Sequence, residues 1–387
     1  MPVEVPNQAN NDSKTEQVVA SVLHGVKDLK IEHRQLGAPE AAEVQVAVQS
    51  TGLCGSDLHY FNHYRNGDII VQEPLTLGHE SSGLVTAVGA DVTSLQVGDR
   101  VALEVGLPCL ECELCTSGRY NICRALRFRS SAKSYPHFQG TLQAKINHPA
   151  VYCHKLPSSV SPHIGAILEP LSVAIHGCRR ASLAKSSTVL IFGAGAVGLL
   201  CAAMCKVYGA KTIVIADIQA ERVDFAVQHC FADAKILVPM KRPQAIEEKL
   251  AFAKEVAELV RGQVGKEVDA VFECTGVESC LHSAIYSTRP GGRIMLIGMG
   301  SPVQTLPISA AALREIDLVG VFRYANTYEE AIKLVSSSNP LLPDLSKLVT
   351  QTFKGFDGIA DAFAMAGRVK DDKGNLVLKV VVETTDS

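Results

Sequence analysis

The chain has 387 residues, more than one hydrophobic core usually supports, so we expect two domains. Its formal net charge of -3 leaves no basic surface and argues against nucleic acid as a partner. The 47% hydrophobic and 20% charged residues are typical of a soluble globular protein. No membrane span is expected, because three glycines interrupt the long uncharged stretch at 189–205.

The N-terminal segment, residues 1–17, is polar and lacks the apolar core of a signal peptide. We expect it to form a flexible arm on a cytoplasmic protein. The sequence also contains 12 cysteines. In a reducing compartment these cysteines indicate free thiols and metal ligands in place of disulfides.

Short alternating runs from residue 18 to residue 48, broken by glycine and proline, predict antiparallel strands. The pattern continues through residues 83–102, where glycine and aspartate mark tight turns between apolar runs. Such a series predicts a small barrel-like β domain.

Cys54, in the motif Cys-Gly-Ser-Asp, and the pair His79-Glu80 lie between these predicted strands. Thiolate, imidazole and carboxylate groups suit zinc, and three protein ligands leave one coordination position for substrate or water. Each residue alone is a weak signal, because a single cysteine or histidine near a turn is more often a packing residue.

The strongest local signal is a run of four cysteines with two-, two- and seven-residue gaps, namely Cys109, Cys112, Cys115 and Cys123. Four thiolates at this spacing predict a closed tetrahedral zinc site with a structural role. An iron–sulfur cluster is the alternative, but the long last gap and the missing proline after the fourth cysteine favour zinc.

Glu169 lies beside Pro170 and precedes an apolar run that contains His176. Two interpretations remain open. The glutamate either begins a helix, where its charge suits the helix dipole, or supplies an acid at the zinc.

Residues 188–217 predict a strand, a tight turn, a helix and a second strand. The turn carries Gly193, Gly195 and Gly198 in a GxGxxG pattern, which permits the turn, the approach of a pyrophosphate and close helix packing. Asp217 follows at the distance at which a carboxylate binds the adenosine ribose, so NAD is favoured over NADP. Arg222 is a minor signal for the opposite preference.

Strands and helices continue to alternate beyond this point, with helices predicted at 220–230 and 246–261 and strands at 268–274 and 293–297. Because ligands bind at the carboxyl ends of parallel strands, Thr275 and residues 297–299 are placed to contact a nicotinamide. A further edge strand is predicted at 318–324. The tail at 348–382 predicts strand, helix and strand, returning to the first domain.

These motifs, with Glu169-Pro-Leu-Ser and Val321-Phe-Arg-Tyr-Ala-Asn-Thr327, make residues 18–382 resemble the zinc-dependent medium-chain dehydrogenases, and within them the polyol branch near the sorbitol dehydrogenases. The resemblance implies an α/β protein with a GroES-like β-barrel catalytic domain and a Rossmann domain with a doubly wound parallel sheet. The expected boundaries are 18–181 for the catalytic domain with a structural zinc lobe at about 105–125, 182–318 for the Rossmann domain, and 319–387 for the C-terminal return.

The resemblance also implies roles for individual residues. Catalytic zinc would be held by Cys54, His79 and Glu80, with Glu169 holding either a water at the metal or the metal itself. Polyol hydroxyls would be held by Tyr60, Glu169, Arg323 and Tyr324. The expected NAD contacts are Gly193, Gly195, Val197, Gly198, Asp217, Arg222, Thr275, Ile297, Gly298, Met299, Val321, Phe322 and Arg323.

The implied reaction is NAD-dependent oxidation of a secondary alcohol, in which zinc acts as a Lewis acid and the nicotinamide accepts a hydride. The proton leaves either through water at Glu169 or through a relay of Ser56 and His59, and the sequence does not decide between them.

D-sorbitol, oxidised to D-fructose, is the expected substrate, with xylitol also accepted. L-arabinitol 4-dehydrogenase and xylitol dehydrogenase are the alternatives, and a non-catalytic NAD-binding protein is a remote one. The four-cysteine lobe is typical of fungal or microbial members, and the resemblance implies a homotetramer.

Overall fold

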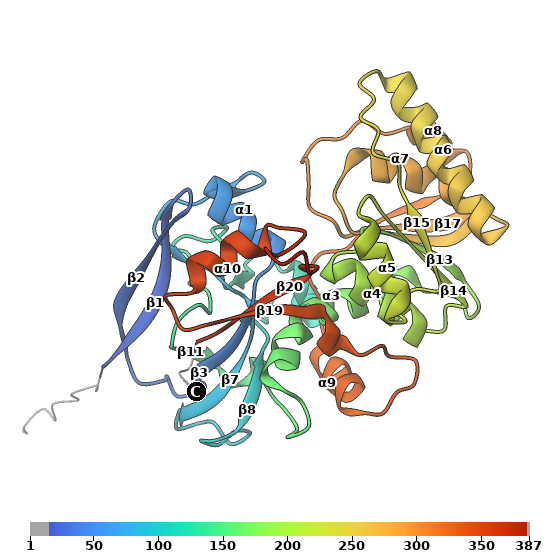
Figure 1. The fold of residues 1–387 in the computed structure, drawn as a ribbon. Coiled ribbons are helices and arrows are strands. Elements are labelled where there is room, and N and C mark those ends of the chain that lie inside the picture. The colour runs from blue at the N-terminus through green and yellow to red at the C-terminus, as the bar shows by residue number, and fades with distance from the viewer. Residues whose placement is uncertain (1–14, 385–387) are drawn as a thin grey trace, which may run out of the picture.

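The computed structural model describes residues 15–384 and folds into two lobes (Figure 1). The arm predicted for residues 1–17 lies outside the described residues up to residue 14, and Glu16 and Gln17 already belong to the first strand. The tail crosses back from the second lobe into the first, as its colour in Figure 1 shows.

The first lobe is built on antiparallel strands, as the alternating sequence predicts. A seven-stranded sheet has the order β12-β8-β7-β3-β20-β19, with β11 also paired to β3, and a smaller sheet has the order β2-β1-β6. Two-stranded pairs, β4 with β5 and β9 with β10, complete it. The strands are β1 (Glu16–Gly25), β2 (Asp28–Leu36), β3 (Glu43–Gly52), β4 (Arg65–Asn66), β5 (Ile69–Ile70), β6 (Leu75–Thr76), β7 (Glu80–Val88), β8 (Arg100–Leu103), β9 (Gly106–Leu107), β10 (Arg127–Phe128), β11 (Lys145–Pro149), β12 (Cys153–Lys155), β19 (Val349–Lys354) and β20 (Lys379–Glu383).

Short helices lie between these strands along the chain. They are α1 (Gly55–His63), α2 (Glu113–Thr116), η1 (Tyr120–Ile122), η2 (Ala150–Tyr152), η3 (Leu345–Leu348) and α10 (Ile359–Ala366). The tail strand β20 pairs with β3, so the end of the chain completes the sheet of its first domain.

The second lobe is a parallel sheet with the order β15-β14-β13-β16-β17-β18, which is the strand order of the Rossmann fold. Helices cover both faces: α4 and α5 share one apolar core, and α6 and α7 share the other. The elements are β13 (Thr188–Phe192), α4 (Ala196–Val207), β14 (Thr212–Asp217), α5 (Ala220–Gln228), β15 (Ala234–Leu237), α6 (Ile246–Val264), β16 (Val268–Glu273), α7 (Glu278–Ser287), β17 (Thr288–Leu296), α8 (Ile308–Ala312), β18 (Asp317–Gly320) and α9 (Tyr328–Ser336).

The edge strand predicted for residues 318–324 is wrong beyond Gly320, where β18 ends. Arg323 has a φ of 51° and Asn326 a φ of 55°, so the chain turns through left-handed conformations that no strand contains. The segment after β18 therefore leaves the sheet and leads into α9.

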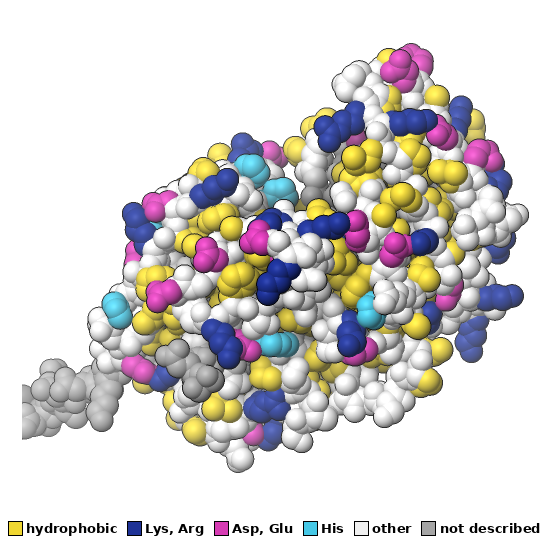
Figure 2. Space-filling model, in the orientation of Figure 1, with side chains coloured by type: hydrophobic (Ala, Val, Ile, Leu, Met, Phe, Trp, Pro, Cys, Tyr) yellow, Lys and Arg dark blue, Asp and Glu magenta, His cyan; other side chains and the backbone are white. Residues whose placement is uncertain are grey.

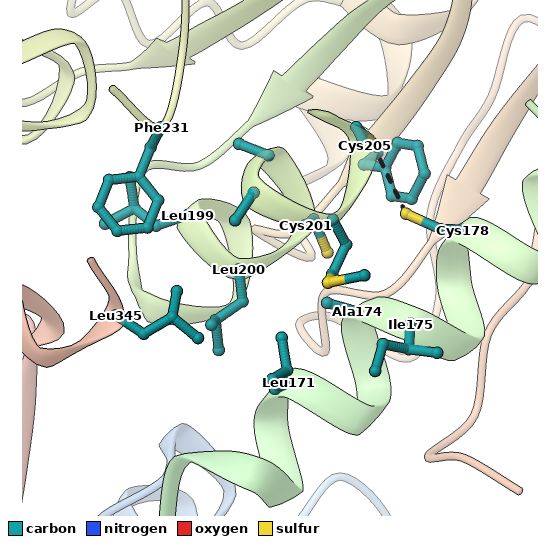
Figure 3. Close-up of a cluster of buried hydrophobic side chains, with 14 of the residues drawn as sticks. Leu171, Ala174, Ile175, Cys178, Leu199, Leu200, Cys201, Cys205, Phe231 and Leu345 are labelled. Carbon is teal, nitrogen blue, oxygen red and sulfur yellow. Dashed lines mark hydrogen bonds between the residues drawn. The ribbon is translucent and has the colours of Figure 1, made fainter. Parts of the chain in front are cut away.

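One helix, α3 (Pro162–Ala181), packs against both lobes. In Figure 3 its side chains Leu171, Ala174 and Ile175 lie next to α4, while Leu345 approaches Leu200 from the C-terminal return. Glu169 lies within this helix, so the interpretation that it begins a helix is wrong. Its helix begins at Pro162, with Ser161 as the N-cap.

None of the helices among residues 15–384 is both long enough and apolar enough to cross a lipid bilayer. On the face shown in Figure 2, basic and acidic side chains are interspersed over both lobes.

Candidate active site and metal centres

Three potential metal ligands converge in the first lobe. One donor atom each from Cys54, His79 and Glu80 lies within 4.8 Å of the others. Cys54 caps the N-terminus of α1, and Glu80 begins β7, where it pairs in register with Gly52 at the end of β3. A thiolate, an imidazole and a carboxylate at this spacing fit a zinc ion with an open coordination position.

Asp57 orients the imidazole of this group. It is fully buried on the first turn of α1, and its carboxylate lies 3.1 Å from His79 Nδ1, which leaves Nε2 as the metal-facing atom. Ser130 Oγ donates to the same carboxylate at 2.6 Å. Burial raises the pKa of Asp57, but His79 and the hydrogen bonds outweigh burial and hold that pKa below its ordinary value. Asp57 lies in the Cys-Gly-Ser-Asp motif, but the motif alone predicts no role for it.

Glu169 lies near this group without belonging to the three converging donors. Its side chain is 5% exposed, and burial raises its pKa to about 7, with His79 acting in the opposite direction and Glu80 adding to the increase. A carboxyl group with this pKa can hold or release a proton near neutral pH.

The expected substrate residues surround the same region. The guanidinium of Arg323 stacks 3.4 Å from the ring centroid of Phe128, and burial lowers its pKa to about 10, with Tyr324 and Glu169 opposing that decrease. The Tyr60 hydroxyl accepts a hydrogen bond from Ala132 N at 3.2 Å. The Tyr324 hydroxyl is buried and has no hydrogen-bond partner among the described residues.

Phe128 is a residue that sequence reasoning missed. Its ring lies 5.5 Å from the His79 ring and also stacks on Arg323, so it contacts both a candidate metal ligand and an expected substrate residue. It stands on the two-residue strand β10, after the four-cysteine lobe, and carries no motif that could have revealed it.

The glycine turn of the Rossmann domain fits a dinucleotide. A Cβ on Gly198 would lie 1.8 Å from Gly193 O, so the helix can pack here only on glycine. Gly195, the N-cap of α4, faces open space into which a phosphate can enter, and Val197 is the second residue of the same helix.

Asp217, the last residue of β14, lies where the sequence predicts a contact with the adenosine ribose. Asp217 accepts hydrogen bonds from Ala194 N at 2.8 Å and Gln219 N at 2.9 Å, and each carboxylate oxygen keeps a free lone pair. Nearby on α5, the buried Nε of Arg222 has no partner among residues 15–384. An unpaired buried guanidinium nitrogen is the kind of group that a bound nucleotide would satisfy.

The loops at the carboxyl ends of β16 and β17 are held together by Glu273. Its carboxylate accepts hydrogen bonds from the backbone and hydroxyl of Thr275 and from Gly276 N. Its backbone oxygen accepts from Ile297 N at 3.0 Å and from Gly298 N at 2.8 Å. Both predicted nicotinamide loops are thereby fixed to one residue.

An open cleft of about 550 Å³ lies between the two lobes. His59 and His63 of α1 line one side, and Gly298 and Met299 line the other. Ser56 Oγ lies 3.4 Å from His79 Nε2, so Ser56 stands at the metal ligands while His59 stands at the cleft wall. The segment with Val321 and Phe322 follows the end of β18, and Val321 N donates a hydrogen bond to Leu296 O at the end of β17.

The four cysteines of the lobe also come together. Four of their Sγ···Sγ distances are 3.5, 3.5, 3.9 and 3.9 Å. Four thiolates at about 2.3 Å from a central zinc would stand about 3.8 Å apart, so the cluster fits a tetrahedral ion. Backbone N–H groups of Glu111 and Cys112 lower the pKa of Cys109 to about 7, which favours the thiolate.

Two family models match this chain. The alcohol dehydrogenase GroES-like domain matches residues 40–158, and the zinc-binding dehydrogenase model matches residues 196–337. Sorbitol dehydrogenase of Gallus gallus is 41% identical over 339 residues, covering 88% of this chain and 90% of its own length. The probable D-xylulose reductase A of Emericella nidulans is 39% identical over 369 residues, covering 94% of this chain and 97% of its own length.

Solved structures agree with these matches. L-idonate 5-dehydrogenase from Escherichia coli is 26% identical, with a TM-score of 0.82 over 96% of this chain and 99% of its own. An Escherichia coli alcohol dehydrogenase in complex with NADH is also 26% identical, with a TM-score of 0.79 over 95% and 99%. The predicted GroES-like and Rossmann architecture is confirmed. The chain belongs to the zinc-containing medium-chain dehydrogenases, in the branch of zinc-dependent polyol dehydrogenases that contains the sorbitol dehydrogenases and D-xylulose reductases.

Proposed function

We propose that this protein oxidises a sugar alcohol at a secondary carbon with NAD, and that D-sorbitol, converted to D-fructose, is its preferred substrate. The observation that carries the proposal is the convergence of Cys54, His79 and Glu80, with the buried Arg323 close enough to Cys54 and Glu169 for their charges to act on it. Sorbitol dehydrogenases from Gallus gallus and Homo sapiens, 41% and 39% identical to this chain, support the choice of polyol.

In this proposal Cys54, His79 and Glu80 hold the catalytic zinc, and the four-cysteine lobe holds a structural zinc. Bound zinc supplies Lewis acidity that eases loss of the alcohol proton, and NAD accepts the hydride. Arg323, Tyr324 and Tyr60 bind and orient the polyol hydroxyls.

Two routes can take the proton in this arrangement. Glu169, buried beside the metal ligands, can hold it. Ser56, followed by His59 at the wall of the cleft, can pass it towards solvent. Replacing each in turn separates the routes: the variant whose kcat loses its dependence on pH identifies the group that carries the proton.

The decisive experiment compares kcat/KM for D-sorbitol, xylitol and L-arabinitol with NAD. We expect sorbitol to lead, xylitol to follow, and turnover to disappear after dialysis against a strong chelator. A clear preference for L-arabinitol, or undiminished turnover after removal of the metal, would reject the proposal.

Xylitol is the second candidate substrate, because probable D-xylulose reductases from fungi are 39% to 42% identical to this chain. The same comparison of substrates decides between the two polyols. A chain that holds one zinc ion would favour a non-catalytic NAD-binding protein, whereas two ions per chain support the enzyme.

We also propose that the chain acts in the cytoplasm as a homotetramer. The family resemblance is the basis for the assembly. Light scattering of the purified protein should give four times the chain mass of 41.4 kDa, and a monomer would contradict this part of the proposal.

A further inference from the structure

A lysine from the tail of the chain contacts the catalytic metal ligands. Lys379, the first residue of β20, donates to Glu80 Oε1 at 2.8 Å and to Oε2 at 2.7 Å, and also to Leu53 O at 3.1 Å. The Lys379 and Glu80 side chains are 5% and 1% exposed. One ammonium group therefore holds both the carboxylate of Glu80 and the backbone that leads directly into Cys54.

Three neighbouring strands fix this contact. Gly52 on β3 pairs with Glu80 on β7 on one side and with Val381 on β20 on the other. A Cβ on Gly52 would lie 2.3 Å from Glu80 Oε2, so the carboxylate can rest against Lys379 only because residue 52 is glycine. Both the cation and the space for the carboxylate are thus provided by the sheet.

The charges of the site explain why a cation is placed there. Glu80 and Glu169 are buried acidic groups next to the partly exposed thiol of Cys54, and buried charges without partners are unfavourable. A carboxylate that ligates a metal is normally held by a further hydrogen bond, and loss of that partner typically weakens metal binding by about 10- to 100-fold.

We propose that Lys379 is a positioning residue for the catalytic metal: it holds the Glu80 carboxylate towards Cys54 and His79 and balances the negative charge of the ligands. The inference rests on the proposed function, because it takes these three residues as the zinc ligands. The C-terminal return then contributes to the metal site itself and not only to the sheet.

The test measures how fast zinc leaves the protein. Lys379→Met keeps the aliphatic stem and removes the charge and the donors. Lys354→Met, on the neighbouring strand β19, is the matched control, because Lys354 is 71% exposed and 3.8 Å from Glu383. Native and variant proteins loaded with zinc are mixed with a chromogenic chelator, and release from the two sites is followed without substrate or cofactor.

We expect Lys379→Met to release zinc from the catalytic site about 10- to 100-fold faster than the native protein. In Lys379→Met, the rate of zinc release from the four-cysteine site should stay at the native value. In Lys354→Met, the rates of zinc release from both sites should stay at their native values. Equal release rates in Lys379→Met and the native protein would overturn the inference alone. A native protein that binds zinc only at the four cysteines would overturn the proposed function together with the inference.

Gly52→Ala is a second variant that disturbs the contact between Lys379 and the Glu80 carboxylate. It keeps the inference testable if Lys379→Met does not fold. The added Cβ displaces Glu80 from Lys379 while leaving the lysine intact. Faster release from the catalytic site is again expected, and a native rate in this variant would count against the inference. In a double variant, Gly52→Ala and Lys379→Met should accelerate release less than the product of their separate effects, since both act through Glu80.

Discussion

The two clusters of metal ligands in this protein are assembled in opposite ways. The four-cysteine cluster comes from one continuous segment that contains α2 and η1, and most of its thiols are partly exposed: Cys109, Cys112, Cys115 and Cys123. The proposed catalytic ligands come from the start of α1 and the start of β7, and Lys379 contacts Glu80 from a strand 299 residues later in the chain. The difference shows that a stabilising site can be local in sequence, whereas a reactive one depends on the completed sheet.

The largest difference between the clusters should appear in catalysis. Cys54→Ser removes one catalytic ligand, and we expect kcat/KM for the preferred polyol to fall about 1,000-fold, because Lewis-acid stabilisation contributes several kcal/mol. Cys230→Ser, at an exposed cysteine outside both clusters, is the control and should keep native activity. Steady-state kinetics with zinc analysis checks the outcome, and native activity in Cys54→Ser would contradict the assignment of this ligand.

Loss of the four-cysteine cluster should lower the free energy of unfolding of the protein. Cys112→Ser opens the four-cysteine site, and we expect unfolding to become easier by about 3 kcal/mol, since binding of a structural zinc contributes directly to folding. On a domain of this size that corresponds to a Tm lower by roughly 6 to 12 °C. Calorimetry measures the change, and zinc analysis should find one ion left in the chain. An unchanged Tm would show that the lobe folds without its metal.

A smaller effect is expected when the ligand His79 is kept and only the group that orients it is changed. Asp57→Asn keeps the shape beside His79 but removes the charge that fixes the imidazole, and we expect zinc to be held about 10- to 100-fold less tightly. Competition with a chelator of known affinity provides the measurement. If zinc binds to Asp57→Asn as it does to the native protein, the hydrogen bond to Nδ1 does not control the ligand.

The smallest expected effect concerns the cofactor and leaves both clusters intact. Asp217→Ser removes the ribose carboxylate, and we expect KM for NAD to rise about tenfold while NADP becomes a better cofactor. The zinc content should remain native, which separates this change from the previous three. An unchanged preference between NAD and NADP would mean that Asp217 does not bind the ribose.

The sequence predicts the parts of the molecule that are encoded by short spacings. The four-cysteine cluster and the GxGxxG turn each lie within one continuous stretch, and the spacing alone restricts what they can form. The alternation of strands and helices from residue 188 onwards predicts the parallel sheet, which the structure confirms. The resemblance supplies the link between Cys54 and His79, which spacing alone does not.

Contacts that depend on tertiary structure are not visible in the sequence. Lys379 meets Glu80 because β20 pairs with β3, and a lysine in an apolar strand carries no sign of that pairing. Phe128 meets Arg323 because a left-handed turn takes the chain out of the sheet after Gly320, where the apolar pattern predicts a continuing strand. In both cases the deciding interaction joins residues far apart in sequence.

The position of β20 also sets an order of events during biosynthesis. The four cysteines at 109–123 emerge from the ribosome early and can take up metal while most of the chain is still being made. The strand that carries Lys379 is translated long after the four cysteines, yet it occupies an interior place in the seven-stranded sheet between β3 and β19. A nascent chain can therefore complete the four-cysteine cluster first, whereas the contact between Lys379 and Glu80 forms only once β20 has been made.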